Sequence, residues 1–311
     1  MQNRTLRILP SAELDHSLWD RCVQQDGKAK VYNYNAYLDC FAPDWQGLVL
    51  GDYEACIPLP AYKRLGSQWL QMPPFIQQFN LAQQQDKPVT EMEKQQINKL
   101  LKKQYKLIRY SCTDISFDRP PAKVRTNYVL DLSETYKVLQ SRFNKNGSKN
   151  IRKTEAFALS LTQGIPVDTV IAFYKAAYGT LNTLKDDQYL LFKKLCATKT
   201  DFFTTQTYGV SNANGELIFA ALLIRDAKAL YYVLGAPNEE GRKKKATYFF
   251  IHEIIKQHAG QPLKLDFEGS DLKNVADFYL SFGPETEPYQ YYQLNNYAFP
   301  AKPVIKALTG I

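Results

Sequence analysis

The stretch LKLDFEGSDLKNVADFYLSFG, Leu263 to Gly283, predicts a strand, a short turn and a helix in direct succession. Apolar residues at positions 263, 265 and 267 alternate with polar ones, which is the period of a strand with one buried face. Ser270 or Asp271 can cap the helix that follows, whose apolar residues at 275, 278, 279 and 282 share one face. Gly283 stands where helices commonly end in a left-handed residue.

Four polar side chains of this stretch are candidates for a functional site: Asp266, Glu268, Asn274 and Tyr279. Asn274 falls in the first turn of the predicted helix, where free backbone N–H groups favour an anion. The Tyr279 hydroxyl can leave the apolar face and act as an acid. Asp266 and Glu268 end the strand, where each can accept a proton from an amine or cap the next helix.

Length and composition indicate two globular domains. A chain of 311 residues is suited to two domains of about 150 residues, and 45% hydrophobic with 23% charged residues is ordinary for a soluble protein. No window approaches the roughly 18 unbroken apolar residues of a membrane span. The first residues, MQNRTLRILPSAEL, contain no apolar core of a secretory signal, so we expect a cytoplasmic protein without integral membrane association.

Cysteine and histidine usage excludes several classes of chemistry. The five cysteines are widely spaced and form no C-x-x-C pair, which argues against a disulfide framework and a structural zinc site. Of the three histidines, His252 and His258 flank a run that resembles a zinc protease motif, but the second ligand position is occupied by Lys256. We therefore expect no metal.

The net charge of +8 suggests an anionic partner and is concentrated in two clusters. The first contains Lys145, Lys149, Arg152 and Lys153, and the second runs from Arg242 to Lys245. Either cluster can be a solvated helix face. The second precedes a predicted helix, where it can also bind a phosphate.

Periodicity in the second half gives the order β, α, α, β, β, β, α, β, α, β. The segments are Phe157–Leu161, Val170–Tyr178, Tyr189–Leu195, Phe203–Val210, Leu217–Ile224, Leu230–Leu234, Ala246–Gln257, Leu263–Phe267, Val275–Phe282 and Tyr289–Gln293.

This order resembles the acetyltransferase fold of the GNAT superfamily. In that superfamily the fourth strand splays from the fifth, and the following loop and helix receive the pyrophosphate of coenzyme A. The resemblance assigns this role to the Glu240–Thr247 segment. It also matches the family's last helix to Asn274, Ala276, Tyr279 and Gly283, which makes Tyr279 the general acid. A backbone N–H at Leu234 or Gly235 would hold the acyl oxygen.

The expected cofactor-binding residues are Leu234, Gly235, Arg242, Lys243, Lys244, Lys245, Ala246, Thr247 and Asn274. One departs from the family pattern, since Lys245 stands where the loop has its middle glycine. Glycine lets backbone approach phosphate closely. Lys245 either obstructs coenzyme A or replaces backbone contacts with side-chain charge.

The first half repeats the same element order without a phosphate loop. Two GNAT-like domains with the run Asn150-Ile-Arg-Lys153 between them resemble the FemAB-like aminoacyl and peptidyl transferases and uncharacterised Bacteroidetes-type relatives. The expected fold is therefore α/β with mixed sheets, with a degenerate domain at 1–145 and a site-bearing domain at 146–311. The tail after about 295 is expected to pack on the first domain.

The resemblance implies an N-acyltransferase or aminoacyltransferase that uses a coenzyme A thioester or aminoacyl-tRNA. The acceptor would be an amine on an anionic small molecule or peptidoglycan precursor, bound by Lys149, Arg152 and Lys153. The alternative is a non-catalytic GNAT-derived module that binds an anionic ligand or RNA, for which 21 tyrosines supply stacking surface.

Overall fold

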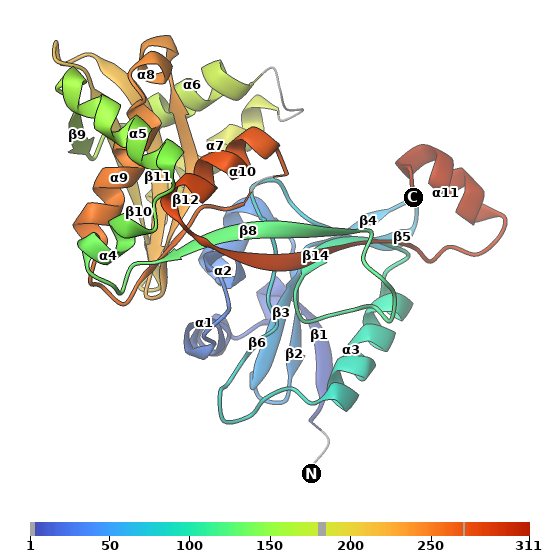
Figure 1. Cartoon of the computed structure of the whole chain (residues 1–311). Helices are drawn as coiled ribbons and strands as arrows, with labels where there is room; N and C mark the ends of the chain where they lie inside the picture. The colour runs from blue at the N-terminus through green and yellow to red at the C-terminus, as the bar shows by residue number, and fades with distance from the viewer. Residues whose placement is uncertain (1–3, 180–184, 270) are drawn as a thin grey trace. The chain divides into compact units, whose positions relative to one another are not determined.

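The computed structural model describes residues 4–179, 185–269 and 271–311 and divides the chain into two compact α/β units (Figure 1). Unit 1 runs to Arg125 and resumes at Pro288–Ile311, and unit 2 is Thr126–Glu287. The sequence analysis divided the chain at 145/146. The structure divides it earlier because strand β8 (Lys123–Asp131) pairs through Val129–Asp131 with β13 (Lys264–Asp266), within unit 2.

Unit 1 contains two sheets with the strand orders β1-β2-β3-β6 and β4-β5-β7-β14. Its strands are β1 Leu6–Pro10, β2 Gln46–Leu50, β3 Ala55–Leu59, β4 Ala61–Arg64, β5 Ser67–Gln71, β6 Ala82–Gln83 and β7 Leu107–Cys112, and β14 Glu285–Asn295 enters from unit 2. Its α-helices are α1 His16–Gln25, α2 Asn35–Phe41, α3 Glu91–Gln104 and α11 Ala301–Thr309.

Local sequence signals account for the helix starts in unit 1. The Asp15 carboxylate accepts from the N–H groups of Ser17 and Leu18 and so caps α1. Thr90 and Glu93 form a capping box at the start of α3. After residue 295, Ile305 of α11 is buried in a cluster with Trp69 and Leu107, so the C-terminal tail packs on unit 1.

The two prolines near β3 predict an edge strand, and the pairing of β3 explains where the edge lies. β3 pairs with β2 along its full length but with β6 only at Ala55 and Cys56. Pro58 therefore lies beyond the end of β6, where its missing N–H breaks no ladder on that side.

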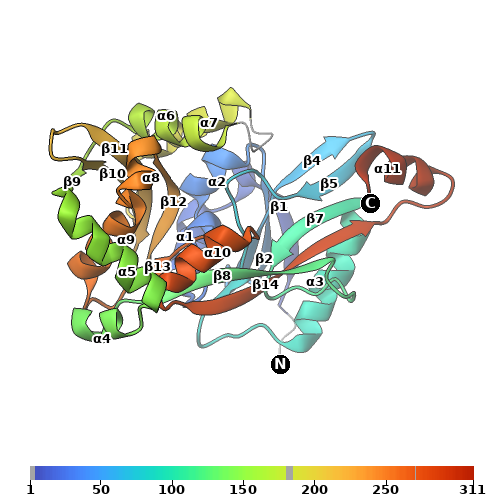
Figure 2. The ribbon, with the colours of Figure 1, turned by 45° about the horizontal axis from the view of Figure 1, so that its top comes forward.

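Unit 2 is a mixed sheet with the strand order β8-β13-β12-β11-β10-β9. Its further strands are β9 Ser160–Gln163, β10 Phe203–Ser211, β11 Leu217–Asp226 and β12 Ala229–Pro237. Its α-helices are α4 Tyr136–Ser141, α5 Lys145–Thr154, α6 Val167–Tyr178, α7 Asp186–Ala197, α8 Glu239–Lys243, α9 Ala246–His258 and α10 Lys273–Tyr279. Helices α6 and α7 lie on one face of the sheet, and α5 and α9 on the other (Figure 2).

The core of unit 2 lies chiefly between the sheet and α9. Phe250, Ile251, Ile254 and Ile255 of α9 are buried against strand residues such as Leu223. Removing such side chains from water stabilises the fold by about 1.5–3 kcal/mol each. The apolar residues of α9 that recur with helical period in the sequence therefore form its buried face.

The opening stretch of the sequence folds as a strand, a turn and a helix, with different caps. β13 is followed by α10 and a 3₁₀ turn at Leu280–Phe282, and Gly283 ends it in the left-handed conformation at φ 69°. The residue before α10 is Leu272, which makes no side-chain cap. Asp271 is thus not the cap, and Ser270 lies outside the described residues.

The predicted strand at Phe157–Leu161 begins later than expected. Residues 155–157 form a 3₁₀ turn, and Ala158 adopts a left-handed conformation at φ 45° that separates the turn from β9. Across residues 4–179, 185–269 and 271–311, no helix is long and apolar enough to cross a membrane.

Candidate active site

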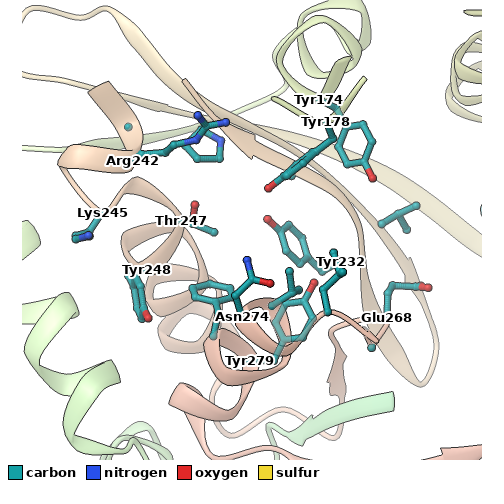
Figure 3. A pocket seen from close by; sticks show the side chains of 18 residues that line it. Tyr174, Tyr178, Tyr232, Arg242, Lys245, Thr247, Tyr248, Glu268, Asn274 and Tyr279 are labelled. Atoms are coloured by element: carbon teal, nitrogen blue, oxygen red, sulfur yellow. The ribbon is translucent and has the colours of Figure 1, made fainter. Parts of the chain in front are cut away.

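A pocket of about 610 Å³ lies in unit 2 where β12 runs on past the end of β13 (Figure 3). Its volume falls in the range of small-molecule sites. The residues that line it come from α6, β12, the α8–α9 segment, the end of β13 and α10: Tyr174, Tyr178, Tyr232, Val233, Gly235, Pro237, Gly241, Arg242, Lys245, Thr247, Tyr248, Glu268, Gly269, Leu272, Asn274, Val275, Phe278 and Tyr279.

The pocket exists because β12 and β13 separate. Their parallel pairing covers only Ala229–Tyr231 against Lys264–Asp266, whereas β12 continues to Pro237. A bulge adds to the divergence, since Leu222 opposes Leu234 and Leu223 opposes Tyr232, which leaves Val233 as the extra residue. Bulges re-aim neighbouring side chains, and Tyr232, Val233 and Gly235 all line the pocket. Leu234, only 1% exposed, does not.

The phenol of Tyr232 lies against the strand edge at Gly235. A Cβ added at Gly235 would sit 1.9 Å from the Tyr232 hydroxyl oxygen, so only glycine leaves room for this side chain. The ring of Tyr232 is held by Phe250, with ring centroids 5.8 Å apart. The place that the sequence analysis assigned to the acyl oxygen is therefore beside a phenol hydroxyl.

The basic end of the pocket is the start of α9. Lys245 precedes the helix with φ 60° and ψ 34°, the left-handed conformation that glycine adopts without steric cost. A lysine there costs roughly 1–2 kcal/mol. The turn thus has the conformation that a glycine would supply. No side chain caps the helix and no acidic residue lies in its first turn, so the local field favours an anion.

The cations of the predicted loop divide into two groups. Arg242, Lys245 and Thr247 line the pocket. Lys243 and Lys244 instead pair with Glu239 and Glu240, each with a nitrogen–oxygen distance of 2.7 Å. These two lysines and the fully buried Ala246 do not line the pocket.

Asp266 organises the turn between β13 and the pocket. One carboxylate oxygen accepts from the N–H of Glu268 at 2.9 Å, and the other accepts from the side-chain amide of Asn127 at 3.0 Å. The side chain is only 2% exposed and does not line the pocket. Glu268 does line it, with a left-handed backbone at φ 65°. Strained non-glycine residues cluster at functional sites, and both Lys245 and Glu268 are of this kind.

Tyr279 and Asn274 of α10 line the pocket. The ring of Tyr279 stacks on Phe267 at 5.0 Å and tilts against Tyr128 at 6.0 Å, which fixes its orientation. Burial raises the pKa of Tyr279, and the nearby Glu268 carboxylate raises it further. The phenol is therefore neutral at physiological pH and can donate a hydrogen bond.

Sequence reasoning missed four tyrosines that line the pocket with Tyr279: Tyr174, Tyr178, Tyr232 and Tyr248. Tyr174 and Tyr178 are four residues apart on α6, a spacing that places them on one helix face, with ring centroids 5.1 Å apart. Burial raises the pKa of Tyr174 to about 12 and also raises those of Tyr178 and Tyr232. Tyr174, Tyr178, Tyr232 and Tyr279 converge in Figure 3, and Tyr248 lies apart from them on α9.

The first basic cluster lies on α5 and does not line the pocket. Lys149, Arg152 and Lys153 are exposed, while Asn150 and Ile151 of the same run are buried. α5 is connected to the pocket wall, since the Asn146 side-chain amide donates to the Tyr248 hydroxyl at 3.1 Å.

The described part of the chain contains no group of three or more His, Cys, Asp and Glu residues that would hold a metal ion. The polar side chains that line the pocket are phenols, cations, a threonine hydroxyl, an amide and a carboxylate. Such a set can bind an anion at one end and stabilise a developing negative charge at the other.

Comparison with solved structures shows the fold. The crystal structure of FemX matches 98% of this chain and 100% of its own, at 10% identity and a TM-score of 0.65. A conserved protein of unknown function from Bacteroides thetaiotaomicron matches 93% of this chain and 100% of its own, at 12% identity and a TM-score of 0.55. A tandem GNAT protein from the clavulanic acid biosynthesis pathway matches 94% and 99%, at 11% identity and a TM-score of 0.52.

No protein-family model matches the sequence, and no curated protein sequence matches it. The similarity to the solved structures extends over nearly the whole chain and both units. The chain therefore has the tandem GNAT-like fold, of the FemX type, that its sequence pattern predicted.

Proposed function

We propose that the pocket of unit 2 is the active site of an N-acyltransferase or aminoacyltransferase of FemAB-like type. It would move an acyl or aminoacyl group from a thioester or tRNA donor to an amine of an anionic acceptor. The observation that carries this proposal is the polarity of the pocket. Arg242 and Lys245 lie at one end, beside the uncapped start of α9, and the neutral phenol of Tyr279 lies on α10.

The donor would bind by its phosphate groups at the basic end. Both donor classes, coenzyme A thioesters and aminoacyl-tRNA, carry phosphates. Backbone N–H groups at the start of α9 and the side chains of Arg242, Lys245 and Thr247 would hold them, and Asn274 would contact the arm of the donor. The tandem GNAT protein similar to this chain is described as a structure without AcCoA, and acetyl-CoA is accordingly the thioester that the proposal considers first.

The transfer itself needs one bond made and one broken. The free amine attacks the acyl carbon, so that a C–N bond forms and the C–S or C–O bond of the donor breaks. The nitrogen then loses a proton, and the departing sulfur or oxygen gains a proton. Glu268, directly or through water, would receive the amine proton, and Tyr279 would donate to the leaving atom. Holding both substrates together supplies about 7–11 kcal/mol, whereas one acid or base contributes about 10²–10⁴-fold.

The raised pKa of Tyr279 shapes its role with each donor. A phenol with a raised pKa protonates an alkoxide readily, so it is suited to the ribose oxygen of a tRNA ester. A thiolate has a reference pKa near 8.5 and takes the proton less readily. With a thioester, Tyr279 would act mainly as a hydrogen-bond donor to the departing sulfur.

The acceptor would be an anionic small molecule or peptidoglycan precursor, bound by the exposed cations Lys149, Arg152 and Lys153 of α5. The experiment that tests the function is mass-spectrometric detection of transfer from acetyl-CoA and from aminoacyl-tRNA to an amine panel. We expect Tyr279→Phe to reduce the rate by about 10²-fold or more. Turnover that is unchanged in both Tyr279→Phe and Lys245→Ala would place the chemistry elsewhere.

A second candidate is a non-catalytic module that binds an anionic ligand or RNA. The position of the Tyr232 phenol against Gly235 favours it, because that phenol occupies the strand edge beside the proposed acyl site. Titration with a short RNA at two salt concentrations separates the candidates. Steep salt dependence without turnover on any donor supports binding alone.

A further inference from the structure

Helix α11 lies beside the hairpin of β4 and β5 in unit 1, as both Figure 1 and Figure 2 show. Ile305 of α11 and Trp69 of β5 belong to one buried cluster, and the Trp69 indole donates to the Tyr297 hydroxyl at 2.9 Å. The Arg64 guanidinium lies 5.1 Å from the centre of the Trp69 ring, which connects the end of the hairpin to the same packing. We call residues 61–67 and 295–311 together the α11 surface.

The α11 surface exposes large apolar side chains. Phe299 and Leu308 are 87% and 69% exposed, the highest values among the large apolar side chains of the described residues. Val304 is 58% exposed, and its spacing from Leu308 places the two on one face of α11. Leu65, at the tip of the hairpin, is 62% exposed. Single exposed apolar residues are common, but four on adjoining elements mark an interaction surface.

The tip of the hairpin gives an independent sign of function. Leu65 and Gly66 form the two-residue loop between the paired residues Arg64 and Ser67. Both loop residues have positive φ, 50° and 72°, as a type I′ turn requires. Asn, Asp or Gly is preferred in such turns, whereas a leucine is sterically strained there and also exposed to water. Leu65 therefore does not serve the stability of the hairpin, and strained residues of this kind cluster at functional sites.

The charge of the α11 surface is entirely positive. Its exposed cations are Lys63, Arg64, Lys302 and Lys306. Neither 61–67 nor 295–311 contains an acidic residue. The Asn296 amide contacts the Lys102 carbonyl of α3, and the Lys102 ammonium pairs with Asp118 at 2.6 Å, so that carboxylate is already neutralised. The partner of this surface is therefore expected to be both apolar and anionic.

We propose that the α11 surface docks on a phospholipid bilayer that contains anionic lipid. Phe299, Leu308 and Leu65 enter the boundary between headgroups and acyl chains, and the four cations bind the lipid phosphates. A bilayer accepts side chains from separate elements without a matching pocket. A second copy of this chain fits less well, because a symmetric contact brings the cations of one copy against those of the other. This surface lies in unit 1 and does not depend on the chemistry proposed for unit 2.

The test is co-sedimentation of the full chain with vesicles. One set contains phosphatidylcholine alone, and the other contains equal parts of phosphatidylcholine and phosphatidylglycerol. We expect binding to the anionic vesicles, release as salt is raised, and at least about tenfold weaker binding to the neutral vesicles. Leu308→Ser and Phe299→Ser should each weaken binding roughly tenfold through lost apolar contact. Lys302→Gln should weaken it about fivefold.

The hairpin variant Leu65→Asn separates binding from folding. It supplies the Asn-Gly dipeptide that type I′ turns prefer, so the melting temperature should stay equal or rise. Binding to anionic vesicles should nevertheless fall roughly fivefold or more, because an apolar side chain is lost. A purely structural role of Leu65 would not combine an unchanged melting temperature with weaker binding.

The matched controls are Leu190→Ser and Lys137→Gln in unit 2. Leu190 of α7 is 55% exposed, and Lys137 of α4 is exposed. Both variants should bind anionic vesicles like the wild type, and thermal melting verifies that every variant is folded. Absent binding, equal binding to both kinds of vesicle, or wild-type binding by Leu308→Ser and Phe299→Ser would overturn the proposal. Self-association that Leu308→Ser abolishes, without vesicle binding, would assign the surface to a second copy instead.

Discussion

Replacing Lys245 by glycine separates the two ways in which residue 245 can serve the donor. Lys245→Gly relieves a left-handed backbone cost of roughly 1–2 kcal/mol. Glycine also raises the entropy of the unfolded chain, which offsets about 0.4–1 kcal/mol of that gain. The expected net stabilisation is therefore up to about 1.6 kcal/mol, and each 1 kcal/mol raises the melting temperature by about 2–4 °C.

The matched variant is Lys245→Ala, which removes the same charge and keeps a Cβ at φ 60°. Urea denaturation should find the glycine variant about 1 kcal/mol more stable than the alanine variant. Both should bind coenzyme A more weakly than the wild type by the same factor, since both lose one cation. Equal stability of the two variants would show that residue 245 is not held in the left-handed conformation.

Three further predictions concern other parts of the chain. Burial raises the pKa of Asp20 from 3.8 to about 7. The free energy of unfolding should therefore fall as pH rises from 3.8 to 7, by at most about 4 kcal/mol. In Asp20→Asn, urea denaturation should find a smaller change of stability over this pH range. The hydrogen bond from Arg4 lowers the pKa of Glu93 from 4.5 to about 2. The ionised Glu93 therefore contributes at most about 3 kcal/mol to the free energy of unfolding above pH 4.5, and this contribution is lost as pH falls through 2. Glu93→Gln should abolish this acid dependence. Gly235→Ala should destabilise unit 2 by about 1–3 kcal/mol through a clash with Tyr232, and Tyr232→Ala in the same chain should relieve it, as a double-mutant cycle would measure.

Much of the fold could be predicted from the sequence because its elements carry clear periods. Phe250, Ile251, Ile254 and Ile255 recur with the period of the buried face of α9, and Asn214-Gly215, a dipeptide typical of hairpin turns, lies between β10 and β11. Strand β8 went unrecognised because its polar first half, Lys123 to Asn127, breaks the alternation of Tyr128 to Leu130. The division into units then followed strand pairing over long sequence separations, which local patterns do not contain.

The candidate site was predictable where its residues follow one another along the chain. Arg242, Lys245, Thr247, Glu268, Asn274 and Tyr279 line one pocket. The four tyrosines that converge in the pocket could not be predicted as a group, because Tyr174, Tyr178 and Tyr232 meet Tyr279 only in the tertiary structure. The different environments of Lys243 and Lys244 follow from their partners four residues earlier, Glu239 and Glu240, a pairing visible in the sequence.

The most direct test of the central claim is one mass-spectrometric measurement of product. The full chain is incubated with the amine panel and, in separate arms, acetyl-CoA or aminoacyl-tRNA, and the N-acylated product is quantified against the Tyr279→Phe variant. The account predicts product in at least one arm, reduced by about 10²-fold or more in the variant. No product in either arm, while both donors bind at the start of α9, would contradict an acyl-transfer site and leave a binding module in its place.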